Sequence, residues 1–92
     1  MRTIEKDIDG RHFTAAEHDG HGTIKYGLAE AGEMDLWFRW SVDADRWVWL
    51  RDGIGTTVDR EALVTAEVAA DWEREGWIPA EAWEMLSALK SA

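Results

Sequence analysis

Three histidines and two acidic residues lie close together in the first quarter of the chain, and their side chains have the chemistry to bind a metal ion. The group consists of His12, Glu17, His18, Asp19 and His21. Imidazole nitrogens and carboxylate oxygens together suit zinc or manganese. In zinc proteases, two histidines lie one helical turn apart, and the histidines here do not have that spacing. The sequence also contains no second cluster of such residues. A small metal- or ligand-binding enzyme domain that uses His12, His18 and His21 is therefore an alternative hypothesis, and no metal or cofactor is assigned.

The sequence contains no recognisable nucleophile or phosphate-binding motif. The absence of cysteine excludes a thiolate nucleophile, a disulfide framework and cysteine-ligated zinc. None of the serines, Ser41, Ser87 and Ser91, lies in a G-x-S-x-G turn. The glycine turns at residues 20–22 and 53–55 match neither G-x-G-x-x-G nor a P-loop. The sequence therefore predicts a protein that is not an enzyme and that acts by binding.

The chain is strongly acidic, and its negative charge is concentrated toward the C-terminus. The formal net charge is −9, from 19 acidic and 10 basic residues, and residues 59–92 contain eight acidic and three basic residues. A negative field repels phosphate backbones and acidic membranes, and it accelerates the encounter with basic surfaces. We therefore expect a protein partner with a basic, nucleic-acid-binding surface, and no direct contact with nucleic acid or membrane.

Six carboxylates in the C-terminal third are candidate partner-binding groups, because their spacing places them on the exposed sides of helices. They are Glu67, Asp71, Glu73, Glu75, Glu81 and Glu84. Rows of carboxylates spaced somewhat like phosphates would occupy the basic groove of a nucleic-acid-binding protein. The alternative is a solvated helix surface, since glutamate is a good helix former that also improves solubility.

Seven tryptophans in 92 residues are the most informative feature of the composition. Trp37 alternates with the apolar residues of its strand and should project from the opposite face, while Trp47 and Trp49 share one face of the next strand. If the two strands pair about the turn at residues 43–45, the three indoles form an exposed platform. Its flanking basic residues would be Arg39, Arg46 and Arg51. Indoles are frequent interface anchors, so Trp37, Trp47 and Trp49 are predicted to bind the partner, and a homodimer through this surface is possible.

A second packing of the same strands stays open, because a slip of one residue in the register exchanges the two faces. In that arrangement Trp47 and Trp49 lie beneath the helices, against Trp72 and Trp83. Val48 and Leu50 are then left outside.

The elements that must position these groups follow from the hydrophobic pattern. Apolar residues alternate on both sides of Asp9-Gly10, a dipeptide typical of two-residue hairpins. Alternation continues through residues 24–28, is clearest over residues 34–42 and returns over residues 46–51. Residues 1–56 are therefore predicted to form an antiparallel meander of four to five strands.

From Thr57 onward the apolar period changes to four residues, at Val64, Val68 and Trp72, which predicts a helix. Thr57 or Asp59 is expected to cap its start, and Gly76 to end it. A second helix is expected from Pro79. Residues 57–92 thus provide two helices packed on one face of the sheet, and the whole chain, 1–92, is predicted to be a single α+β domain.

The segment from Asp71 to Glu81, with the pattern W-x-x-x-G-x-I-P-A, resembles the end of the recognition helix and the following turn of small phage Cro-like helix-turn-helix repressors. That resemblance covers about a fifth of the chain and implies DNA binding. The segment departs from the pattern where the repressors contact DNA, because only Arg74 stands among its carboxylates. A degenerate helix-turn-helix regulator is therefore a further alternative.

In size, acidity and lack of catalytic motifs the chain is similar to the small phage-encoded inhibitors of bacterial defence, including anti-CRISPR proteins. The similarity concerns general character and rests on no shared motif. It implies a protein that binds a defence nuclease or its guide-RNA complex and blocks its access to DNA. No apolar stretch resembles a signal peptide or a membrane span, so the expected location is the cytoplasm, that of the host cell if the protein is phage-encoded.

Overall fold

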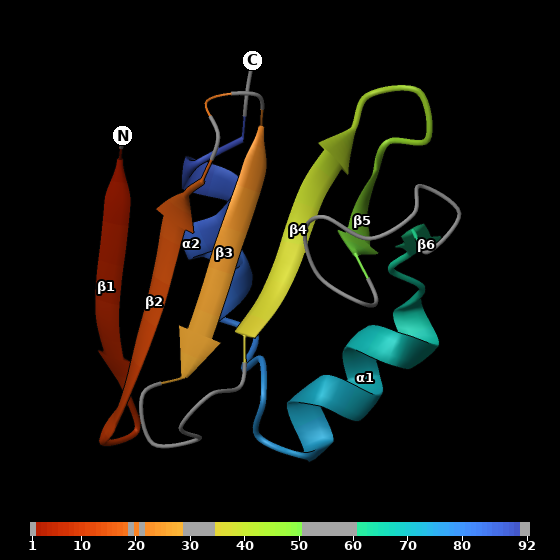
Figure 1. Cartoon of the computed structure of the whole chain (residues 1–92). Helices are drawn as coiled ribbons and strands as arrows, with labels where there is room; N and C mark the ends of the chain where they lie inside the picture. The colour runs from red at the N-terminus through yellow and green to blue at the C-terminus, as the bar shows by residue number, and fades with distance from the viewer. Residues whose placement is uncertain (1, 19, 21, 29–34, 51–60, 91–92) are drawn as a thin grey trace.

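The computed structural model describes residues 2–18, 20, 22–28, 35–50 and 61–90, which form an antiparallel sheet and two helices (Figure 1). The six strands lie in the sheet in the order of the chain. Their bounds are β1 Thr3–Ile8, β2 Arg11–Glu17, β3 Thr23–Leu28, β4 Asp35–Ser41, β5 Arg46–Leu50 and β6 Glu61–Leu63. The helices are α1 Ala66–Arg74 and α2 Ala82–Ala88. The predicted α+β fold with a meander followed by two helices is confirmed, with one or two strands more than expected.

Two tight turns set the register of the sheet. Asp9 and Gly10 both have positive φ, at 52° and 79°, and they join β1 to β2 so that Ile8 pairs with Arg11. Asp45, with φ of 52°, closes the turn between β4 and β5. This backbone conformation is accessible to aspartate because its short polar side chain tolerates the left-handed region. The hairpin predicted at Asp9-Gly10 is confirmed.

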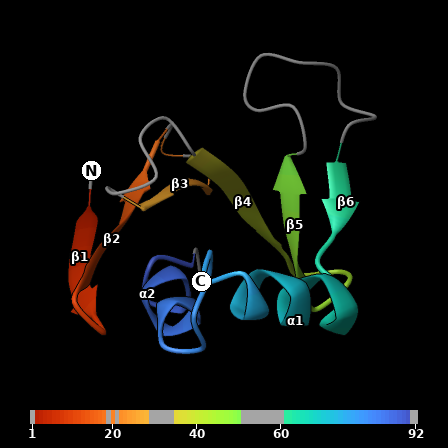
Figure 2. The same ribbon diagram turned by 90° about the horizontal axis from the view of Figure 1, so that it is seen from below.

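Both helices lie on the same side of the curved sheet (Figure 2). Between them and the sheet is the core, in which the largest fully buried side chains are Phe13, Ile24, Tyr26, Phe38, Ile78, Leu86 and Leu89. The Tyr26 hydroxyl donates a hydrogen bond of 2.7 Å to the carbonyl oxygen of Trp77, which ties the α1–α2 connection to β3. Burial raises the pKa of this phenol. The helices thus cover one sheet face, and the other face carries no described helix.

The predicted start of the helical region is wrong. Glu61–Leu63 forms the last strand and pairs with β5, whereas residues 57–92 were assigned to helices. Helix α1 begins at Ala66, and the Thr65 hydroxyl caps it by accepting a hydrogen bond of 3.1 Å from the Val68 amide. The predicted caps Thr57 and Asp59 lie outside the described residues. The apolar period of four residues was counted from Val64, but Val64 lies in the connection between β6 and α1, so the predicted helix began too early.

The connection between the helices agrees better with the sequence. Helix α1 ends just before Gly76, whose φ of 79° is the left-handed conformation expected of a glycine there. Pro79 begins a helical turn, since its carbonyl accepts a hydrogen bond of 2.9 Å from the Ala82 amide, but α2 itself begins three residues later than predicted. Among the described residues, neither helix is long and apolar enough to cross a membrane.

Candidate functional site

All six predicted carboxylates of the helical region are exposed to solvent. Glu67, Asp71 and Glu75 follow one another at intervals of four residues and therefore lie along one side of α1 and its C-terminal end. Asp71 forms an ion pair with Arg74, and Glu75 accepts a hydrogen bond of 3.2 Å from the Trp77 indole nitrogen. This side of the molecule is negatively charged, because residues 61–90 contain seven acidic residues and two basic ones, Arg74 and Lys90.

Two of these acidic residues line a pocket together with a third from the first hairpin of the chain. A pocket of about 320 Å³ lies between the β1–β2 turn and the α1–α2 connection, and three of its lining residues are Asp9, Glu73 and Glu81. Its remaining lining residues are Ile8, Arg11, Phe13, Gly76, Pro79 and Ala80. We call it the acidic pocket. Asp9 was missed as a site residue because its sequence signal was that of a turn, and only the fold brings it near the helices.

Arg11, the one cation among the described residues that line the acidic pocket, is already engaged by the protein itself. Arg11 donates a hydrogen bond of 2.7 Å from Nη1 to the carbonyl oxygen of Gly76, and its guanidinium carbon lies 5.7 Å from the centre of the Phe13 ring. A β-carbon at Gly76 would lie 2.6 Å from that same Nη1. Arg11 therefore holds the α1–α2 connection against β2, and the three carboxylates give the pocket a negative charge.

The predicted platform of Trp37, Trp47 and Trp49 is not formed. In the register of β4 and β5, Trp40 pairs with Trp47 and Phe38 pairs with Trp49, so these four side chains share the helix-covered face. Trp47 is only 8 % exposed, and the centre of the Trp49 ring lies 5.1 Å from that of Trp72. Trp47 and Trp49 thus lie beneath the helices, as the alternative packing expects, but Val48 on the opposite face is also buried and is not left outside. The physical cause of this arrangement is the turn at residues 42–45, which fixes the cross-strand pairs.

Trp37 lies on the other face of the sheet, apart from Trp47 and Trp49. It pairs with Lys25, whose ammonium nitrogen is 5.6 Å from the centre of the indole, and the His18 ring meets it edge-on at 4.7 Å. Arg39, on the same face, forms an ion pair of 2.7 Å with Glu61. Of the basic residues expected around a platform, Arg39 is thus beside Trp37, and Arg51 lies outside the described residues.

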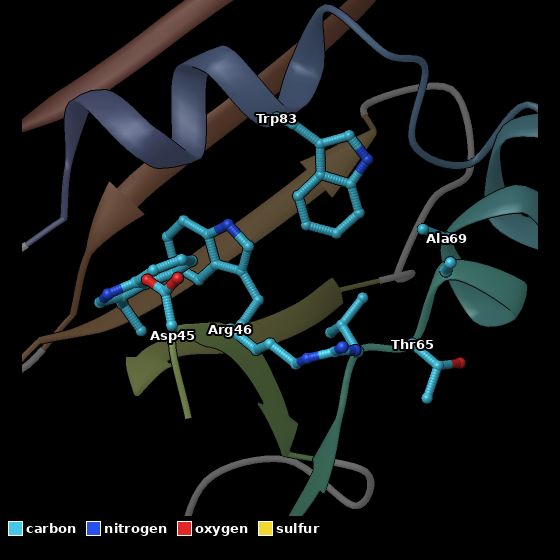
Figure 3. Close-up of a pocket in the computed structure, with 9 residues that line it drawn as sticks. Asp45, Arg46, Thr65, Ala69 and Trp83 are labelled. Atoms are coloured by element: carbon cyan, nitrogen blue, oxygen red, sulfur yellow. The ribbon is translucent and has the colours of Figure 1, made fainter. Parts of the chain in front are cut away.

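A second pocket, of about 280 Å³, lies between the β4–β5 hairpin and the two helices (Figure 3). Its walls are mainly the indoles of Trp40, Trp47 and Trp83, and Asp45 and Arg46 are its charged residues. Val64, Thr65, Ala66 and Ala69 complete the lining. We call it the tryptophan pocket. Of these three tryptophans only Trp47 was predicted to bind the partner, and the sequence left open whether it is exposed or lies beneath the helices near Trp83.

The histidines are not gathered into one site. His12 is held on the sheet by hydrogen bonds of 2.7 Å from Nδ1 to Asp7 and 3.1 Å from Nε2 to Glu5, and these two bonds, Asp7 first, raise the pKa of the imidazole. His18 instead packs on Trp37. His21 and Asp19 lie outside the described residues. Within the described part of the chain, no group of three or more histidine or acidic residues is arranged to hold a metal ion.

The segment that resembles a helix-turn-helix comprises the end of α1 and its connection to α2. Its Asp71, Glu73, Glu75 and Glu81 are exposed, and Arg74 is paired with Asp71. A surface of this sign repels a phosphate backbone. The chain was also compared with known proteins, and no protein-family model, curated protein or solved structure matches it.

Proposed function

We propose that this protein is a noncatalytic binding protein that docks onto a basic surface of another protein. The partner we propose is a nucleic-acid-binding complex of bacterial defence, which the protein inhibits in the manner of the small acidic anti-CRISPR proteins. The observation that carries this proposal is that Asp9, Glu73 and Glu81 line one pocket, beside the exposed carboxylates of α1. Carboxylates contributed by separate segments form a negative surface that does not depend on one helix alone.

The acidic pocket has the size and charge to receive a lysine or arginine side chain of the partner. The Arg11 guanidinium is engaged by the Gly76 carbonyl, so among the described lining residues Asp9, Glu73 and Glu81 provide the charged groups for an incoming cation. A cation that enters such a pocket loses part of its hydration and exchanges it for charge-assisted hydrogen bonds. We therefore expect the carboxylates outside the pocket to increase the rate of association with the partner. Those inside the pocket should decrease the rate of dissociation.

Inhibition then follows from occupancy. A basic groove that accepts the carboxylates of this protein is no longer available to the phosphates of a nucleic acid, since both compete for the same cations. The reaction of the partner is blocked without any chemistry on this chain. Trp37, which is half-buried on the uncovered sheet face, remains a candidate contact, whereas Trp47 and Trp49 act through the fold that positions the carboxylates.

The test is affinity capture from host lysate, with the 92-residue chain as bait at low and moderate salt and with mass spectrometry of the bound proteins. Two variants of equal net charge are compared with the unaltered chain. Glu73→Gln with Glu81→Gln removes two charges from the acidic pocket, and Glu5→Gln with Asp43→Asn removes two exposed charges elsewhere.

We expect a nucleic-acid-binding complex that is lost as salt rises, that is lost with the pocket variant and that is retained by the control variant. Capture that is insensitive to salt, or equal for both variants, contradicts the proposal. A reproducible absence of any macromolecular partner contradicts it as well.

A further inference from the structure

We infer that the tryptophan pocket is a second binding site, and that it takes the alkylammonium end of a lysine side chain. This inference rests on the proposed function, because the lysine belongs to the same basic partner. It adds a site of different chemistry from the acidic pocket, one in which aromatic rings rather than carboxylates provide most of the contact area.

The geometry of the pocket suits a cation on an alkyl chain. The rings of Trp40 and Trp47 meet edge to face, with centres 5.2 Å apart and planes at 79°, and Trp83 approaches from α2 on the other side of the opening (Figure 3). Val64, Ala66 and Ala69 provide an apolar border. The negative face of an indole attracts cations, and tryptophan does so more strongly than the other aromatic residues.

The protein itself places an ammonium group on this aromatic wall. The Nζ atom of Lys90 lies 3.4 Å from the centre of the Trp40 ring and 5.8 Å from that of Trp47. Lys90 is not among the residues that line the pocket, so it reaches the two indoles from beside the pocket and leaves the volume between them and Trp83 unfilled. The faces of these two indoles thus already accept one ammonium group within the protein.

The charged residues at the pocket do not by themselves select a cation over an anion or a neutral side chain. The aromatic rings must contribute to that selectivity. Asp45 provides a carboxylate and Arg46 an opposing charge, and the Arg46 side chain extends toward Thr65, away from Asp45 (Figure 3). The two charges nearly cancel at long range, whereas the net charge of −9 raises the local concentration of cations. The preference between a cation and a neutral group of equal shape therefore depends on the indoles and on Asp45.

The experiment is a titration of the 92-residue chain, followed by NMR through the indole N–H signals. The probes are N-acetyl-lysine N-methylamide, its ε-trimethylated form and the neutral N-acetyl-norleucine N-methylamide, at matched ionic strength. We expect saturable shifts of Trp40, Trp47 and Trp83, and binding of both cationic probes that is about five-fold tighter than that of the norleucine probe.

A matched pair of variants tests the role of the carboxylate. Asp45→Asn keeps a side chain that tolerates the left-handed backbone, and Asp43→Asn makes the same change in the same turn, at a residue that does not line the pocket. Asp45→Asn should weaken binding of the cationic probes, while Asp43→Asn should not. Thermal melting of both variants verifies that the fold is intact.

Equal affinity for the norleucine and lysine probes, or no saturable shift with any probe, overturns the inference. These outcomes are separable from failure of the proposed function. If the probes fail but the lysate capture remains sensitive to salt and to Glu73→Gln with Glu81→Gln, the proposed function stands without this site. If the probes bind selectively but no basic partner is captured, the pocket binds alkylammonium groups and the proposed function fails.

Discussion

The two pockets differ in whether their key side chains belong to the hydrophobic core. The acidic pocket takes its carboxylates from turns and a helix end, where the side chains are exposed and make no contribution to the packing. The tryptophan pocket shares Trp47 with the hydrophobic core, and its Trp83 contacts Phe38 at 5.7 Å between ring centres. A substitution of a carboxylate in the acidic pocket therefore reports on binding, whereas a substitution of a tryptophan in the tryptophan pocket reports on folding first. The effect of a substitution on stability thus depends on whether the side chain packs in the core.

The largest effect expected from this contrast is on stability. Trp47→Ala should lower the free energy of unfolding by about 3–5 kcal/mol, because it removes a large buried ring and leaves a cavity beside Phe38 and Trp40. Trp37→Ala, at the half-buried tryptophan of the uncovered face, should cost about 1 kcal/mol. Chemical denaturation of both variants measures the difference. Similar losses for the two would mean that the faces do not differ as described.

A smaller effect is expected where the acidic pocket is held together. Gly76→Ala should destabilise the protein by more than Gly10→Ala, although both glycines have a φ of 79°. The left-handed backbone costs each variant about 1–2 kcal/mol. At Gly76 the new β-carbon also displaces Arg11, whereas at Gly10 nothing lies within 4 Å of it. Coinciding denaturation curves for the two variants would contradict the inference that Arg11 holds the α1–α2 connection in place.

The smallest effect concerns His12, whose hydrogen bonds to Asp7 and Glu5 lie on the exposed surface of β1 and β2. The pKa of His12 is raised above its ordinary value of 6.5. The contribution of protonated His12 to the stability of the folded protein is therefore fully present below pH 6.5, and it is lost as the pH rises through the higher pKa of the folded state. His12→Gln should abolish this dependence on pH.

An NMR titration of the His12 ring measures the shift directly. Asp7→Asn should lower the pKa of His12 more than Glu5→Gln does, since the bond to Asp7 is the larger cause. The reverse order, or an unshifted pKa in the unaltered chain, would contradict the geometry of this pair of strands.

The elements with local signals were predictable from the sequence. Asp9-Gly10 and the alternation over residues 34–42 are properties of short segments, and they gave the hairpin and the meander. The pairing of Trp40 with Trp47 was not predictable, because a slip of one residue in the turn would have placed Trp47 on the opposite face. Strand β6 escaped notice because three residues are too few to show a period.

The candidate site was predictable only in part. The exposure of Glu73 and Glu81 follows from their helical spacing, and it was expected. Their position at the same pocket as Asp9 depends on how α1 and its connection cross the end of the first hairpin, which brings together residues more than sixty positions apart. No local pattern encodes such a contact.

The order of the strands also has a consequence for how the chain acquires its structure during synthesis. Each strand pairs with its neighbour in the sequence, so hairpins can form in succession as the polypeptide leaves the ribosome. The apolar side of the growing sheet stays open to water until Ile78, Leu86 and Leu89 arrive near the C-terminus to close it. We therefore expect the nascent sheet to be most vulnerable to aggregation just before residues 78–89 emerge, and the docking of α2 to close the core.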